Sequence, residues 1–270
     1  MKRTIVALLA GSAGLAIATP AAAQGGCTAE SLQEMSNDWV AALEQGTMMT
    51  MELGEWVDYN QNFERASLGA FLDEPREIDW KLELFDTQSC QVMVEAAVTS
   101  ESGAQVIATQ FGSGFFGVGG FQNITTGPGD WLFDAEAFVA HAKDQDWGIV
   151  PEGERADRAT LMAIANAYLD RFADPSVAVS LADDCTRIEG GSFTGDQGCA
   201  VGMPTEAGTM EFVERRYVVD VARQAVNVMG RFGPDKLGDS HTFRIEDGKI
   251  RYVHSQTNCK GIEGCGAPAA

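Results

Sequence analysis

The chain has 270 residues, with 39 Asp and Glu against 19 Lys and Arg, and a formal net charge of −20. A field of this sign repels nucleic acid, anionic lipid and polyanionic glycans, so we expect no nucleic-acid partner. A small neutral or aromatic molecule suits the charge better as a ligand.

The first 23 residues have the pattern of a secretory signal peptide. Lys2 and Arg3 form the charged start, residues 5–17 the apolar stretch, and residues 21–23 a small-residue cleavage site. No later segment approaches the roughly 18 apolar residues that a membrane helix needs. We therefore expect a periplasmic or secreted protein without membrane insertion.

All six cysteines follow this leader, and an even number in an oxidising compartment favours disulfide bonds. Their local spacing favours Cys185–Cys199 and Cys259–Cys265, which leaves Cys27–Cys90. Zinc is the alternative, but the chain has no C-x-x-C pair, so we predict disulfides and no metal.

One pattern occurs twice along the chain. Apolar residues at helical spacing in residues 30–45 and 156–172 predict a helix at the start of each half. A segment with a polar tip follows each helix, and then a series of predicted strands. The first half has the polar segment 53–62 and strands 80–85, 90–99 and 105–111. The second half has the polar segment 181–189 and strands 211–221, 225–232, 241–245 and 250–256.

This repetition predicts two domains, 24–145 and 146–260, after the signal peptide 1–23 and before a flexible tail, 261–270. We place the join within residues 144–157. The glycine-rich segment 111–121 predicts a bent strand or a flap over a cavity, because glycine weakens strands and permits bulges.

The most informative segment is the hairpin around Asp247-Gly248, a dipeptide typical of two-residue turns. An unbroken register from this turn places His241 opposite His254, with Cβ atoms about 5 Å apart. It also places both histidines on one face of the sheet, and the apolar or aromatic members of that face are Phe243, Ile245, Ile250 and Tyr252.

These elements together resemble the nuclear transport factor 2-like superfamily, which includes SnoaL-like polyketide cyclases, ketosteroid isomerases and scytalone dehydratases. Residues 184–190, 216–220 and 241–254 look like the second half of an uncharacterised secreted domain common in fungi, and residues 56–62 and 129–133 look like its first half. The resemblance covers most of the chain after the leader. It implies an α+β fold of two fused cone-shaped domains, each a helix packed on a strongly bent antiparallel sheet, joined sheet to sheet as a pseudo-dimer.

The resemblance also implies proton-transfer chemistry without a cofactor, since many members work in this way. Some bacterial members are lyases that act on lignin-derived aromatic dimers. His254 is then the candidate base, and His241 the acid or the partner that orients the base, because imidazole titrates near neutral pH. A metal site needs a further ligand such as Asp184 or Glu189. The candidate substrate-binding residues are Tyr252, Tyr59, Asn62, Arg187, Asp184 and Arg216.

We therefore expect an exported, cofactor-independent lyase, dehydratase or isomerase that acts on a small aromatic molecule, as a monomer or a homodimer. Lignin-derived molecules are among the candidate substrates. The alternative is a non-catalytic binding protein that holds an apolar small molecule in the same pocket. A third interpretation is an interaction module whose sheets only form a dimer.

Overall fold

The structure is a computed structural model that describes residues 27–114, 117–208, 210–263 and 265. The predicted signal peptide and most of the predicted tail lie outside these residues. The described chain consists of two halves, each with a long helix and six strands.

The first half begins with a helix that has a typical capping residue at each end. Thr28 caps the N-terminus by accepting from the backbone N–H of Ser31, and Gly46 ends the helix in the left-handed conformation, which glycine adopts without strain. The elements of this half are α1 (Ala29–Gln45), η1 (Met48–Thr50), β1 (Leu53–Gln61), β2 (Glu64–Arg65), α2 (Leu68–Phe71), β3 (Glu77–Asp86), β4 (Gln91–Ser100), β5 (Gly103–Gly114) and β6 (Gly117–Thr126).

Two short elements lie between the halves, and the second half then repeats the arrangement. The linking elements are α3 (Ala135–Ala142) and η2 (Glu152–Glu154). The elements of the second half are α4 (Arg158–Asp170), β7 (Leu181–Glu189), β8 (Ser192–Phe193), η3 (Gly195–Gln197), β9 (Phe212–Asp220), β10 (Ala225–Phe232), β11 (Leu237–Glu246) and β12 (Lys249–Asn258).

The two sheets have the same topology. The strand orders are β2-β1-β6-β5-β4-β3 and β8-β7-β12-β11-β10-β9. In each sheet the first long strand pairs in parallel with the last one, β1 with β6 and β7 with β12, and the other pairs are antiparallel. The prediction of an α+β fold with one pattern used twice is confirmed at this level. The purely antiparallel sheets that the resemblance implies are wrong, because each sheet contains one parallel pair and is therefore mixed.

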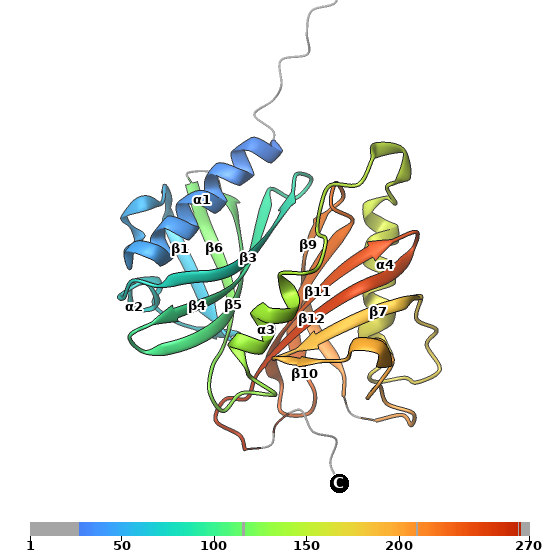
Figure 1. Ribbon diagram of the computed structural model, residues 1–270. Helices are drawn as coiled ribbons and strands as arrows, with labels where there is room; N and C mark the ends of the chain where they lie inside the picture. The colour runs from blue at the N-terminus through green and yellow to red at the C-terminus, as the bar shows by residue number, and fades with distance from the viewer. Residues whose placement is uncertain (1–26, 115–116, 209, 264, 266–270) are drawn as a thin grey trace, which may run out of the picture.

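The sheets pack face to face between the two helices. In Figure 1, α1 and α4 lie toward opposite sides of the molecule, with the strands of both halves between them. Side chains from both sheets form common buried clusters, one of which joins Leu84 and Met93 to Val218 and Ala225. Each half therefore has one sheet face under its own helix and one face against the other half.

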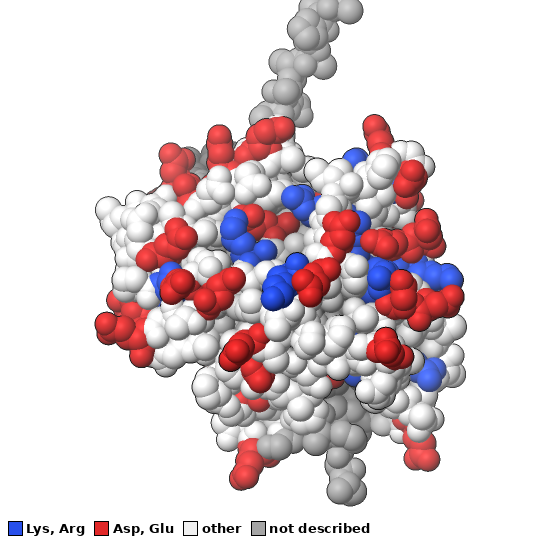
Figure 2. All heavy atoms as spheres, in the orientation of Figure 1, with Lys and Arg blue, Asp and Glu red and all other residues white. Residues whose placement is uncertain are grey.

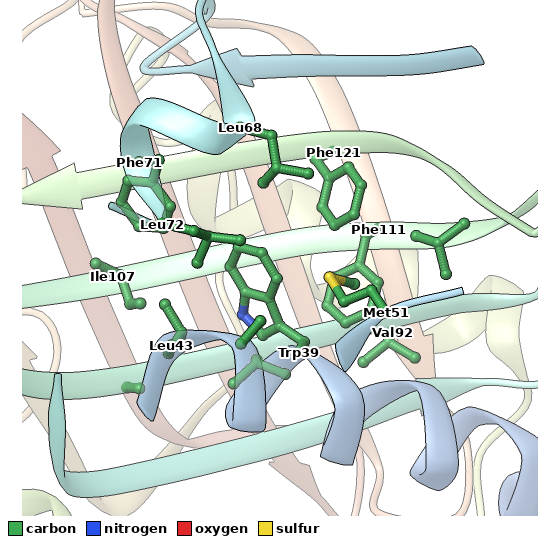
Figure 3. Close-up of a cluster of buried hydrophobic side chains, with 14 of the residues drawn as sticks. Trp39, Leu43, Met51, Leu68, Phe71, Leu72, Val92, Ile107, Phe111 and Phe121 are labelled. Carbon is green, nitrogen blue, oxygen red and sulfur yellow. The ribbon is translucent and has the colours of Figure 1, made fainter. Parts of the chain in front are cut away.

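The helix-covered face of the first half is filled by apolar side chains. Figure 3 shows Trp39 of α1 among Phe71, Phe111 and Phe121, and its ring centroid lies 5.6 Å from that of Phe111 and 5.5 Å from that of Phe121. Trp39 is fully buried. Aromatic packing of this kind leaves the first half with a hydrophobic core in the place where a pocket would otherwise open.

The predicted glycine-rich flap belongs to two paired strands. Residues 111–114 end β5 and residues 117–121 begin β6, with a register irregularity between Gly112 and Ser113. The sequence predicts a bent strand or a flap here, and it predicts no strand for the rest of β6, up to Thr126.

All three predicted disulfide bonds are present: Cys27–Cys90, Cys185–Cys199 and Cys259–Cys265. The first connects the start of α1 to the turn between β3 and β4, and the second connects β7 to the loop after η3. In the part of the chain that the structure describes, no helix is long and apolar enough to cross a membrane. Figure 2 shows Asp and Glu side chains spread widely over the face drawn there, with Lys and Arg among them, so the acidic charge is not confined to one patch.

Candidate functional site

The predicted turn at Asp247-Gly248 is present. Asp247 and Gly248 have φ angles of 50° and 73°, the left-handed values that a type I′ turn requires. Glu246 pairs with Lys249 across the turn, as the unbroken register demands.

One residue beyond the turn breaks this register. Ile245 still pairs with Ile250, but Arg244 pairs with Tyr252, so Arg251 is an extra residue in β12. Such a bulge shifts every later pair by one position and moves every later side chain to the other face.

The prediction that His241 faces His254 is therefore wrong. His241 pairs with Ser255, and His254 pairs with Thr242. His241 lies with Phe243 and Ile245 on the face covered by α4, whereas His254 lies with Tyr252 on the face that packs against the first half. The two imidazoles cannot act as one acid–base pair.

His241 is paired with a carboxylate on its own strand. Its Nδ1 lies 2.6 Å from Oδ1 of Asp239, and Oδ2 of Asp239 accepts from the hydroxyl of Thr257 at 2.6 Å. His241 and Asp239 are both buried. Since the carboxylate holds Nδ1–H, the ring is fixed with Nε2 at its other end, and among the described residues no partner occupies Nε2.

Aromatic rings enclose this imidazole on the α4 side. Four rings have centroids within about 6.3 Å of that of His241: Tyr168, Phe172, Phe212 and Phe243. A histidine with an oriented carboxylate in an apolar enclosure is the arrangement that general acid–base catalysis uses.

Arg187 reaches the same enclosure from β7. Its Nη1 lies 3.3 Å from the hydroxyl oxygen of Tyr168 and donates to the Cys199 carbonyl at 3.1 Å, and its Nη2 lies 3.2 Å from Oε2 of Glu189. Burial works to lower the pKa of Arg187, but Tyr168 and Glu189 hold that pKa above its usual value. Burial also raises the pKa of Tyr168, and the Arg187 cation only partly offsets this, so the phenol stays protonated. Tyr168 thus connects His241 to Arg187.

His254 occupies a different environment between the halves. Its Nδ1 lies 3.1 Å from Oε2 of Glu95, and its Nε2 lies 2.6 Å from Oε1 of Gln145. Gln256 donates to the other oxygen of Glu95 at 2.6 Å. Three further rings pack around the imidazole, those of Trp80, Phe138 and Trp147. Because both ring nitrogens already have partners and His254 is fully buried, this residue joins the two halves.

The predicted residues of the first half serve its packing. Tyr59 is buried in the first core, where its hydroxyl accepts from Asn123 at 2.9 Å, and burial raises its pKa well above the usual value. Asn62 has a φ of 53° in the turn between β1 and β2, and its side chain accepts from the backbone N–H of Thr125 at 2.9 Å. Asparagine tolerates this conformation well, which explains its place in the turn.

The remaining predicted residues line two separate surface cavities. Asp184 and Tyr252 line one of about 510 Å³, where Asp184 pairs with Arg251 at 3.1 Å. Arg216 lines another of about 430 Å³ between the halves. The structure therefore brings together only His241 and Arg187, through Tyr168, and disperses the other predicted residues.

Sequence reasoning missed Asp239, Thr257 and Tyr168. Asp239 precedes His241 by two residues, and this spacing puts both side chains on one face of a strand, so an available signal was overlooked. No group of three or more His, Cys, Asp or Glu within the described residues is arranged to hold a metal ion.

Comparison with known proteins gives limited matches. Residues 154–257 match a family described as a domain of unknown function (DUF8021). A solved structure of a DUF4783 family protein from Bacteroides fragilis is similar at 13% identity and a TM-score of 0.24, over 33% of this chain and 96% of that chain. No curated protein matches the sequence.

Proposed function

We propose that the second half is a cofactor-independent lyase, dehydratase or isomerase that acts by proton transfer on a small, uncharged aromatic molecule. The observation that supports this most strongly is the 2.6 Å contact between Asp239 and His241 within an aromatic enclosure. In this proposal His241 is the base, in place of His254, the candidate base expected from the sequence.

The Asp239 carboxylate orients the imidazole of His241. Asp239 accepts the proton of Nδ1, which leaves the Nε2 lone pair available and stabilises the imidazolium that forms after proton abstraction. Thr257 holds the second oxygen of Asp239 and so fixes the carboxylate itself.

Tyr168 and Arg187 supply the complementary group. The phenol is protonated and its oxygen accepts from the Arg187 guanidinium, so its own O–H can donate to an oxygen that gains negative charge when the substrate loses a proton. The rings of Phe172, Phe212 and Phe243 would contact the flat faces of an aromatic substrate.

The equivalent positions of the first half carry neither a histidine nor a carboxylate. Counted from the bulge, His241 corresponds to Thr109 and Asp239 to Ile107, and Ile107 is part of the apolar core in Figure 3. The first half thus serves as a structural partner in this proposal. The predicted leader and the three disulfides support export to the periplasm or the medium.

The experiment is a turnover screen of the oxidised chain without its leader. Small aromatic ethers, alcohols and ketones, lignin-derived dimers among them, are incubated with the protein, and products are separated by mass. We expect turnover of at least one class, and its loss in His241→Asn. Turnover that persists in His241→Asn would contradict the assignment of the base.

One observation favours the alternative of a non-catalytic binding protein. His241 is only 4% exposed, so a molecule beside it would be almost fully enclosed, as ligands of binding proteins often are. Under this alternative an apolar molecule co-purifies with the protein, and no member of the screen is converted.

A further inference from the structure

At the interface between the sheets, β6 of the first half and β12 of the second half occupy equivalent places in their strand orders. We call the part of the interface beside each of these strands the edge at β6 and the edge at β12. The same bulge occurs in both halves: Gly112 pairs with Gly120 just before it in the first, and Arg244 pairs with Tyr252 in the second. Counting on from these pairs, Gln122 of β6 stands where His254 stands in β12. The two edges can therefore be compared residue by residue.

The edge at β12 is filled by the segment that links the halves. Trp147 of this segment packs against Tyr252 with ring centroids 5.8 Å apart and against His254 at 5.1 Å. Gln145 of the same segment contacts Nε2 of His254. An aromatic ring with a neighbouring polar group thus completes this edge.

The edge at β6 is open. The tyrosine of the other edge is replaced by Gly120, and apart from its two chain neighbours no described residue has an atom within 4 Å of the position that a Cβ at Gly120 would take. A cavity of about 430 Å³, which we call the interdomain cavity, lies here between residues of both halves. Its wall includes Gln122, which is 3% exposed and whose amide nitrogen has no hydrogen-bond partner.

Arginines outnumber carboxylates in the wall of the interdomain cavity, although the protein is strongly acidic. Three arginines line it, Arg158, Arg215 and Arg216, against one carboxylate, Asp58. Arg158 pairs with Asp86, and Arg215 pairs with Asp170. Among the described residues no carboxylate lies within ion-pair distance of Arg216, so its guanidinium remains available to a ligand.

We propose that the interdomain cavity binds a small aromatic carboxylate. The ring lies over Gly120, in the space that aromatic side chains fill at the equivalent edge. The carboxylate binds Arg216, whose planar guanidinium matches it with two parallel hydrogen bonds. Gln122 contributes an amide hydrogen bond from the wall.

This site is distinct from the proposed active site. Arg216 pairs with Met229, a residue buried between the sheets, whereas His241 lies under α4. The charge requirement also differs, since Arg216 in the cavity selects an anion, whereas the described residues around His241 include no unpaired cation, Arg187 being paired with Glu189. Binding in the cavity is therefore independent of turnover at His241.

The test is calorimetric titration of the oxidised chain without its leader, using benzoate and 4-hydroxybenzoate. Cyclohexanecarboxylate serves as the non-aromatic probe and benzyl alcohol as the uncharged one. We expect saturable binding of at least one aromatic acid, with weaker binding of both control probes and weaker binding at high salt.

Two variants locate the binding. Arg216→Gln should weaken it about tenfold or more, the loss expected for a charge-assisted contact. Gly120→Tyr should abolish it by restoring the side chain of the other edge. Lys249→Gln, which removes one exposed charge, Gly153→Tyr, at an exposed glycine, and His241→Asn should leave the affinity unchanged.

Three outcomes would overturn the proposal. These are no saturable binding of either aromatic acid, binding that survives both Arg216→Gln and Gly120→Tyr, or equal affinity for cyclohexanecarboxylate. If Gly120→Tyr does not fold, as judged by its unfolding transition, Arg216→Gln decides alone.

Discussion

Asp86 and Asp220 stand at equivalent ends of β3 and β9, and each accepts a hydrogen bond from the strand of the other half. Oδ2 of Asp86 accepts from the backbone N–H of Val219 at 3.0 Å, and Oδ2 of Asp220 accepts from the backbone N–H of Phe85 at 3.0 Å. Both carboxylates are buried. These two reciprocal hydrogen bonds fix the position of one sheet on the other. The other contacts at the interface between the halves depend on that position.

Removing either carboxylate should destabilise the protein. The two oxygens of Asp220 accept from the backbone N–H groups of Phe85 and Arg223, and Asp220→Asn keeps only one acceptor oxygen. One buried donor then loses its partner, which costs about 1–3 kcal/mol of unfolding free energy. Asp86→Asn should cost at least as much, because Asp86 also pairs with Arg158. Denaturant unfolding measures both, with the exposed Asp144→Asn as control. Changes equal to that control would show that the contact does not hold the halves together.

Acid should weaken the same contact. Burial works to raise the pKa of Asp86, but hydrogen bonds from Arg158, Ser89 and the N–H of Val219 together hold it below the usual value. The unfolded chain titrates near its ordinary value of about 3.9. The stabilisation is therefore complete above that pH and is lost as the pH falls through the lower folded-state pKa. Unfolding free energies between pH 6 and pH 2 should show a smaller acid-dependent loss in Asp86→Asn; equal slopes would contradict this.

The disulfide between Cys185 and Cys199 should stabilise the second half. The two residues are 14 apart in the chain, and closing a loop of this size contributes about 3 kcal/mol by restricting the unfolded state. Replacing both cysteines by alanine should lower the unfolding free energy by about that amount. It should also loosen Arg187, which donates to the Cys199 carbonyl. A variant as stable as the parent would contradict this prediction.

The contact between His254 and Glu95 should couple the halves energetically. His254→Phe keeps a ring against Trp147 but removes both nitrogens, which leaves Glu95 short of one partner. A double-mutant cycle with Glu95→Gln should give an interaction energy of about 1–3 kcal/mol. Additive effects of the two substitutions on the unfolding free energy would show that the contact contributes nothing specific.

Local signals in the sequence predicted much of the fold. The Asp247-Gly248 turn, the repeated order of helix and strands, and the cysteine pairs all depend on short spacings or on a pattern used twice. β6 was only partly recognised, because its glycines indicate bending and because pairing with β1 and β5, which the sequence does not display, holds it as a strand.

The site was harder to predict because one β-bulge determines which side chains lie on each face of the sheet. Arg251 has nothing in its side chain that marks an extra residue, and the same irregularity appears where β12 pairs with β7. Tertiary pairing thus sets the register beyond Ile250. Because of this bulge, His254 lies at the interface between the halves, and His241 contacts Asp239, two residues away on the same strand.

The most direct test of the central claim compares kcat for the parent, His241→Asn and His141→Asn on a substrate from the turnover screen. His141 is a half-buried histidine stacked on Phe193, away from the proposed active site, so its replacement controls for the loss of an imidazole. Loss of a general base predicts a fall in kcat of about 10²–10⁴-fold in His241→Asn, with the unfolding transition retained and His141→Asn unchanged. Equal kcat values for the parent and a folded His241→Asn would contradict the account.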